Sequence, residues 1–99
     1  MARIRWTEEA ASCLEEIQAH IGGDSLSAAQ RVIRGIYDQI QMLAQFPELG
    51  YRYTDRPDKD IRIFLYGHYR IVYLVHEADE VVEILGIYHG ALDIDRYLN

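Results

Sequence analysis

The hydrophobic period of this chain changes once, near its middle, and that change restricts the fold more than any other feature. In the first half, Ala10, Leu14, Ile17 and Ile21 recur every three or four residues, the spacing of one helix face. From Ile61 onward the period is two, and β-branched and aromatic residues dominate, as is typical of strands. The pattern predicts an α+β domain, with a helical layer encoded first and most of a sheet encoded after it.

Capping residues and glycines predict where the first elements begin and end. A short strand is expected over Arg3–Trp6. The hydroxyl of Thr7 suits the N-cap position of a helix, and Glu8 and Glu9 would lie favourably in its first turn. Gly22 and the glycine after it should end this helix.

A second helix is expected to follow after a short turn. Asp24, Ser25 and Ser27 are all suitable caps for it, and Pro47 should end it. Two helices joined by a glycine turn predict an antiparallel helical hairpin. The polar segment Glu48–Asp60 is predicted to be a loop.

The remainder of the chain predicts a three-stranded meander. Strands are expected over Ile61–Tyr66, Tyr69–His76 and Val81–His89, with turns at Gly67-His68 and Glu77–Glu80, and a short helix over Leu92–Leu98. The expected order is β-α-α-β-β-β, an antiparallel sheet with an N-terminal helical hairpin on one face and a short C-terminal helix. A chain of 99 residues has room for one domain, spanning 1–99.

Both faces of the predicted sheet are rich in apolar residues. If Leu65 pairs with Arg70, one face carries Ile61, Ile63, Leu65, Arg70, Val72 and Leu74, and the other carries Arg62, Phe64, Tyr66, Tyr69, Ile71, Tyr73 and Val75. A short helical hairpin can cover only one face. Either a partner chain or a second copy covers the other, or the long loop and the C-terminal segment fold over it.

The turn at Glu77–Glu80 sets the expected register of the last two strands. If His76 pairs with Val81, Arg70 lies opposite Ile87, and His89 shares a face with Arg70 one diagonal step away. Arg70 and His89 would then act together at one end of the sheet. A shift of one residue would separate them.

Charge and composition narrow the classes of function. The formal net charge is −6, whereas proteins that grip phosphates rely on a basic field. Cys13 is the only cysteine, and His20, His68 and His76 lack the spacing of metal ligands, so no metal or other cofactor is expected. We expect no membrane segment and no secretory signal, and therefore a cytoplasmic protein.

The order of elements and several short motifs resemble the RelE/ParE superfamily, the toxins of type II toxin–antitoxin pairs, also described as plasmid stabilisation proteins. The resemblance rests on the strand Tyr69-Arg70-Ile71-Val72-Tyr73, on the acidic turn after it, and on Val82-Glu83-Ile84-Leu85 leading to His89-Gly90 with Asp93. The helix ending in Leu43-Ala44 and followed by Phe46-Pro47-Glu48-Leu49-Gly50 also fits. The resemblance to this superfamily covers nearly the whole chain.

This resemblance implies a cytoplasmic growth inhibitor that a cognate antitoxin neutralises, as part of a toxin–antitoxin hetero-oligomer. ParE-like members bind DNA gyrase, whereas RelE-like members cleave mRNA on the ribosome without a metal. When the RelE-like residues are matched to this sequence, Arg70 corresponds to their arginine. The positions where they have lysines are occupied by Ile61 and Ile63, and their later arginine is absent near Gly90. A terminal tyrosine corresponds to Tyr97 only one residue out of step.

The ParE-like interpretation is therefore favoured, with no enzymatic activity. The alternatives are a RelE-like endoribonuclease and a non-toxic homologue that only binds an antitoxin. Under the endoribonuclease alternative, Arg70, His89 and Tyr97 would be catalytic. Arg70 could instead form a structural ion pair with Asp93 or Glu83.

Five residues on one sheet face are the candidates for partner binding. They are Arg62, Phe64, Tyr66, Tyr69 and Tyr73. The alternative is that the tyrosines pack in the core of the domain and that Arg62 is a plain surface charge.

Overall fold

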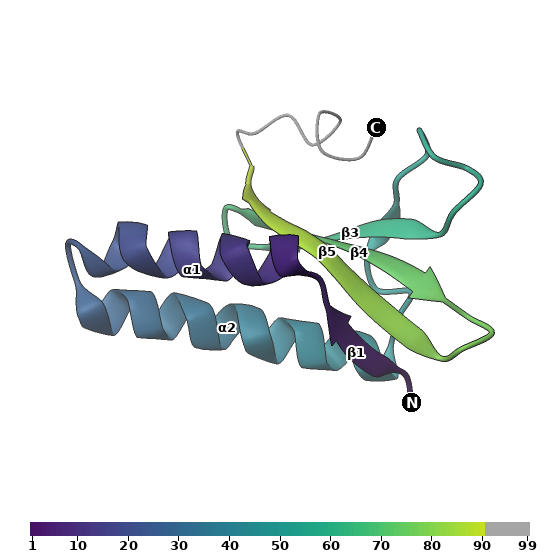
Figure 1. Cartoon of the computed structure of the whole chain (residues 1–99), viewed down its shortest axis with the longest axis horizontal. Coiled ribbons are helices and arrows are strands. Elements are labelled where there is room, and N and C mark those ends of the chain that lie inside the picture. The colour runs from purple at the N-terminus through teal and green to yellow at the C-terminus, as the bar shows by residue number, and fades with distance from the viewer. Residues whose placement is uncertain (91–99) are drawn as a thin grey trace.

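The computed structural model describes residues 1–90, which form two helices packed on one five-stranded sheet (Figure 1). In chain order the elements are β1 (Arg3–Trp6), α1 (Glu8–Gly22), α2 (Leu26–Gln45), β2 (Tyr51–Arg52), β3 (Ile61–Tyr66), β4 (Tyr69–His76) and β5 (Val81–His89). The strands lie in the order β1-β5-β4-β3-β2. No helix in residues 1–90 is long and apolar enough to cross a membrane.

The α+β fold expected from the sequence is confirmed, and so are most element limits. The Thr7 hydroxyl accepts a hydrogen bond from the Ala10 N–H and caps α1, and Ser25 caps α2 in the same way. Strands β3, β4 and β5 begin and end where the alternation predicts. The helix expected over Leu92–Leu98 lies outside the described residues.

The sheet differs from the expected one at both edges. Strand β1 pairs in parallel with β5, with Arg3 opposite Val81 and Trp6 opposite Ile84, so the sheet is mixed rather than purely antiparallel. The segment predicted to be a loop contains the short strand β2, in which Tyr51 pairs with Ile63. Parallel strands need a long crossover connection, and the helical hairpin and the first strands of the meander provide one between β1 and β5.

The helices cover the sheet face that carries the tyrosines of β3 and β4. Gly35 of α2 lies against the hydroxyl end of the Tyr66 side chain. The antiparallel register places Ile71 and Tyr73 on the same face as Tyr66, and both are fully buried. Together with Ile36 and Ile40 of α2 they belong to the main hydrophobic core.

The second face of the sheet is also largely buried within this single chain. Ile61 and Val72 are 3% and 0% exposed. Tyr53, from the segment after β2, donates its backbone N–H to the Ile61 carbonyl and is itself buried. Of the two alternatives for this face, cover by the chain's own loop is supported near Ile61, where the loop residues Arg56 and Lys59 line a pocket together with Ile61 and Leu74. Leu65, at the other end, is 56% exposed.

Candidate functional site

A β-bulge in β5 changes the register that the sequence predicts at the end of the sheet. Val72 lies opposite Gly86, but Tyr73 lies opposite Ile84, so Leu85 is an extra residue in β5. The Thr7 hydroxyl donates to the Ile84 carbonyl at 2.7 Å and can also reach the Leu85 carbonyl at 3.2 Å. The first residue after β1 thus satisfies backbone carbonyls at the bulge and ties the start of α1 to β5.

This bulge separates two of the predicted site residues. Arg70 pairs with Tyr88 rather than Ile87, and Tyr69 pairs with His89. His89 therefore lies on the Tyr69 face, where its ring packs edge-on against Tyr69 with centroids 5.8 Å apart. The prediction that Arg70 and His89 share a face is wrong because the bulge moves the pairing by one residue.

Arg70 and His89 nevertheless reach the same pocket, because it lies at the open end of the sheet. We call it the end-of-sheet pocket; it measures about 280 Å³ and is lined by Leu65, Gly67, His68, Tyr69, Arg70, His89 and Gly90. The rings of His68 and His89 stack with centroids 6.1 Å apart. His68 is the residue that the sequence analysis missed, and its position in the β3–β4 turn, near the end of β5, is what could have identified it.

Arg70 supplies a cation that the described chain leaves unpaired. The side chain is half-buried, and no hydrogen bond or ion pair joins it to another residue within 1–90. The alternative in which Arg70 pairs with Glu83 is wrong, since Glu83 binds Arg5 and His76 instead. Asp93, the other suggested partner, and Tyr97 lie outside the described residues. A partly desolvated guanidinium favours an anion such as a phosphate or carboxylate.

Arg62, in contrast, is engaged in holding the chain together. Its Nε donates to Asp60 Oδ1 at 3.0 Å, and its Nη1 donates to the Gly50 carbonyl at 3.0 Å and the Glu48 carbonyl at 3.3 Å. The side chain is 16% exposed. Arg62 therefore clamps the segment between α2 and β2 against β3, and it offers little surface to a partner.

Tyr73 is also part of the interior. It has no exposed surface, and its hydroxyl donates to the Pro47 carbonyl at 2.7 Å and accepts from the Gly50 N–H at 2.8 Å. Burial raises the pKa of the Tyr73 phenol, an effect that the Gly50 N–H partly opposes. In this conformation Tyr73 has no atom that a partner could touch.

The other three candidates for partner binding are half-buried. Phe64, Tyr66 and Tyr69 pack against the core cluster and keep part of their surface accessible. Tyr69 also lines the end-of-sheet pocket. The structure thus brings Tyr69, Arg70 and His89 together and leaves Arg62 and Tyr73 in structural roles.

The end-of-sheet pocket lacks the further cations that phosphate cleavage would need. Ile61 and Ile63 occupy the positions where the RelE-like resemblance implies lysines, and both are at most 4% exposed. Within residues 1–90, no three His, Cys, Asp or Glu side chains are placed to hold a metal ion. One guanidinium and two imidazoles can bind an anion, but they provide little stabilisation for a pentacovalent phosphate.

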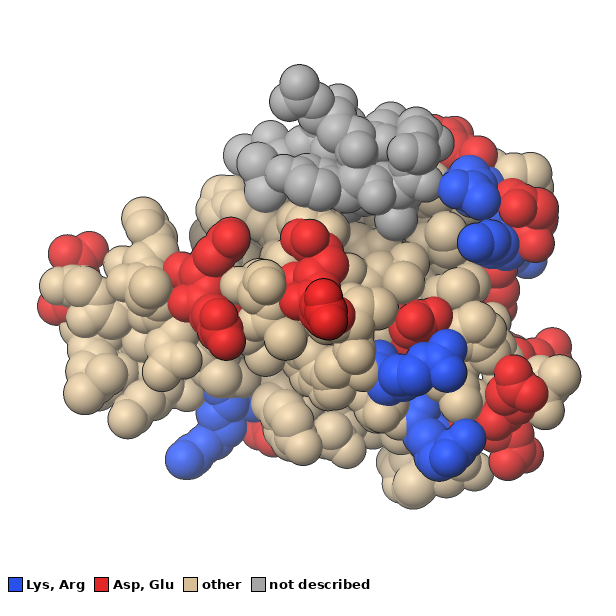
Figure 2. Space-filling model, in the orientation of Figure 1, with Lys and Arg blue, Asp and Glu red and all other residues tan. Residues whose placement is uncertain are grey.

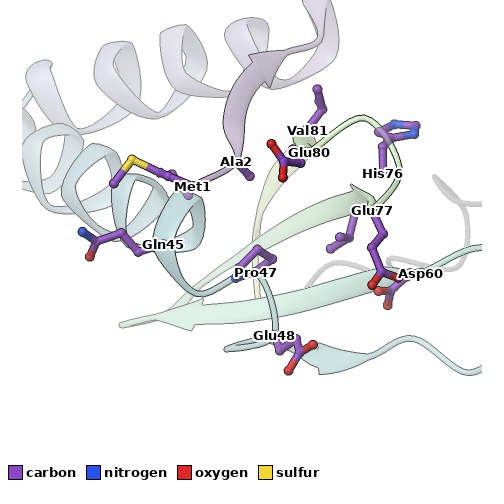
Figure 3. Close-up of a pocket in the computed structure, with 12 residues that line it drawn as sticks. Met1, Ala2, Gln45, Pro47, Glu48, Asp60, His76, Glu77, Glu80 and Val81 are labelled. Carbon is purple, nitrogen blue, oxygen red and sulfur yellow. The ribbon is translucent and has the colours of Figure 1, made fainter.

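A second pocket, at the opposite end of the sheet, has the opposite electrostatic character. It measures about 290 Å³ and lies among the N-terminus, the end of α2 and the β4–β5 turn. Figure 3 shows the carboxylates of Glu48, Asp60, Glu77 and Glu80 around it. Such a pocket repels nucleic acid, so the end-of-sheet pocket is the better candidate for anions.

Comparison with known proteins places these features in a family. The family model described as "ParE toxin of type II toxin-antitoxin system, parDE" matches residues 4–94. A curated relative, "Putative toxin Y4kP" of Sinorhizobium fredii, is 44% identical over 48 residues. That match spans 48% of this chain and 50% of the relative, so it covers about half of each.

Solved structures share the fold at low sequence identity. A chain of the chromosomal ParDE system from P. aeruginosa matches with a TM-score of 0.73 at 21% identity, over 90% of this chain and 96% of that one. A chain of the RelBE2 toxin–antitoxin complex from Mycobacterium tuberculosis matches with a TM-score of 0.59 at 22% identity, over 89% and 96%. One from the archaeal RelE–RelB complex of Pyrococcus horikoshii gives 0.54 at 17% identity, over 93% and 98%.

Proposed function

The chain belongs to the ParE toxin family of type II toxin–antitoxin systems, and we propose that it inhibits growth by binding DNA gyrase until a cognate antitoxin neutralises it. In this proposal the protein acts in the cytoplasm and is stored as a toxin–antitoxin hetero-oligomer. The similar folds come from a ParDE system and from two toxin–antitoxin complexes, which supports an antitoxin as the partner.

One observation favours binding over cleavage. Ile61 and Ile63, where the superfamily resemblance would place catalytic lysines, are buried at 3% and 4% exposure. A lysine at either of these buried apolar positions would place an unpaired charge in the core and destabilise the folded state. The packing of this core therefore disfavours cations at both positions. The net charge of −6 adds to this, because a ribosome-bound nuclease benefits from a basic surface.

The test of the gyrase proposal uses the purified chain and purified gyrase. We expect the chain to inhibit supercoiling of relaxed plasmid, and we expect prior addition of the protein encoded beside its gene to restore supercoiling. Induced cells should arrest with a DNA-damage response. Growth arrest with normal plasmid supercoiling and unaffected gyrase would contradict the proposal.

Endoribonuclease activity is the second candidate, and the end-of-sheet pocket is what favours it. Arg70 is unpaired within residues 1–90, and the stacked rings of His68 and His89 line the same pocket. Primer extension on mRNA after induction would reveal new 5′ ends. If this activity exists, Arg70→Ala and His89→Ala should abolish the cleavage, whereas His20→Ala, an exposed histidine on α1, should not. An absence of new 5′ ends would exclude this candidate.

A further inference from the structure

A groove runs between α1 and the end of β5. It shares no lining residue with the acidic pocket of Figure 3. It measures about 430 Å³ and is lined by Glu9, Cys13, Glu16, Ile17 and His20 of α1, Tyr69 of β4, and Ile87, Tyr88 and His89 of β5. We call it the α1–β5 groove.

The floor of the α1–β5 groove is apolar and its helical rim is acidic. Ile17 and Ile87 lie in the floor, with 9% and 2% of their surface exposed. Glu9 and Glu16 are exposed and lie seven residues apart, on the same side of α1. The α1 residues from Glu9 to His20 extend about 16 Å along the helix axis, or about three turns.

The acidic rim has no basic partner within the described chain. Helix α1 contains four glutamates and neither lysine nor arginine. None of these glutamates forms an ion pair within residues 1–90. Figure 2 shows acidic side chains over α1, whereas the basic side chains on that face lie over β1, along the lower edge below the helices and at the upper right. A ligand that fits this groove must therefore bring positive charge as well as apolar surface.

We propose that the α1–β5 groove is the docking site for an antitoxin segment that carries lysine or arginine beside apolar side chains. The apolar side chains contact the floor at Ile17 and Ile87, and the basic ones pair with Glu9 and Glu16. This inference rests on the proposed toxin–antitoxin function, and it adds the surface and the charge of the partner. Nucleic acid is excluded from this groove, because its phosphates would face the carboxylates of α1.

The groove also explains how one partner could influence the end-of-sheet pocket. Tyr69 and His89 line both cavities. A segment seated in the α1–β5 groove would contact one side of His89, whose other contacts include the His68 ring. Neutralisation would then involve direct contact with the candidate functional site rather than a change of fold.

The test compares two double variants on the same helix. Glu9→Gln with Glu16→Gln removes the charges of the groove rim, and Glu8→Gln with Glu15→Gln removes the same charge from exposed positions that line no described cavity. Both pairs are seven residues apart, and both include one glutamate of the first helical turn. Affinity is measured by calorimetry with the protein encoded beside this gene, and unfolding temperature shows that each variant is folded.

We expect the rim variant to bind about tenfold more weakly, and the control variant to bind within about twofold of the unmodified chain. Raising the salt concentration from about 0.1 M to about 1 M should weaken the unmodified chain more than the rim variant. Equal weakening of both variants, or of neither, would refute the groove as the docking site while leaving the toxin–antitoxin proposal in place. If the unmodified chain fails to bind its neighbour at all, the proposed function itself is refuted and the groove assignment with it.

Discussion

Tyr73→Phe is the substitution that best distinguishes a structural tyrosine from a partner-binding one. The Tyr73 hydroxyl donates to the Pro47 carbonyl and accepts from the Gly50 N–H, so it ties the segment after α2 to the centre of the sheet. The ring itself has no exposed surface. The substitution removes one oxygen atom and leaves the packing of the ring unchanged.

The expected cost follows from the two backbone groups that lose their partner. The hydrogen bond from the Gly50 N–H is buried. Leaving that N–H without an acceptor would cost about 1–3 kcal/mol of folding free energy. The bond to the Pro47 carbonyl is only partly buried, and water can replace it at a cost of about 0.5 kcal/mol. We therefore expect Tyr73→Phe to lower the free energy of unfolding by about 1.5–3.5 kcal/mol, and the melting temperature by about 6–28 °C.

Urea unfolding followed by circular dichroism measures this loss, with Tyr37→Phe as the matched control. Tyr37 is 50% exposed on α2, and its variant should unfold within about 0.5 kcal/mol of the unmodified chain. The slope of free energy against urea should stay constant in both. A loss below about 0.5 kcal/mol for Tyr73→Phe would show that the two hydrogen bonds do not hold this segment.

The same residue predicts a loss of stability at alkaline pH. Burial raises the pKa of Tyr73 above its ordinary value of 10.0, so the folded state holds the proton more tightly than the unfolded state. The stability that the protonated Tyr73 contributes is fully present below pH 10.0 and is lost as the pH rises through the pKa of Tyr73 in the folded state. Tyr73→Phe should remove this part of the alkaline unfolding, and an identical alkaline profile in the variant would contradict the assignment.

Three further substitutions test other parts of the structure, each by the free energy of unfolding. Gly86→Ala should cost about 1–3 kcal/mol, because a Cβ there would overlap the buried Tyr88 ring; an unchanged stability would show that the ring moves freely. Thr7→Ala should cost about 1–2 kcal/mol through loss of the α1 cap and of the hydrogen bond to β5, and a loss within error would contradict both roles. A hydrogen bond from His76 and the nearby Arg5 lower the pKa of Glu83 from 4.5. The stability that the ionised Glu83 adds to the fold is therefore present above pH 4.5 and is lost as the pH falls through the folded pKa. Glu83→Gln should therefore cost about 0.5–1 kcal/mol at neutral pH and nothing at strongly acidic pH, and a pH-independent difference would contradict this origin.

Local chemistry was sufficient to predict the elements of this fold within residues 1–90, except the short strand β2. The caps Thr7 and Ser25 and the period of the apolar residues depend only on neighbours along the chain, and they gave strands β3, β4 and β5 at their observed limits. The family resemblance likewise followed from short motifs in a fixed order, and the family model confirms it. Arg70 was identified as a candidate because it matches an arginine of the RelE-like resemblance.

Tertiary structure alone decided which residues share a surface. At the bulge, the carbonyls of Ile84 and Leu85 accept hydrogen bonds from the hydroxyl of Thr7, which lies more than seventy residues earlier in the chain. That one inserted residue moved His89 to the opposite face from Arg70, and the open end of the sheet then brought His68 beside it. Faces of a sheet alternate with every residue, so a single long-range contact reverses an assignment that local periodicity cannot correct.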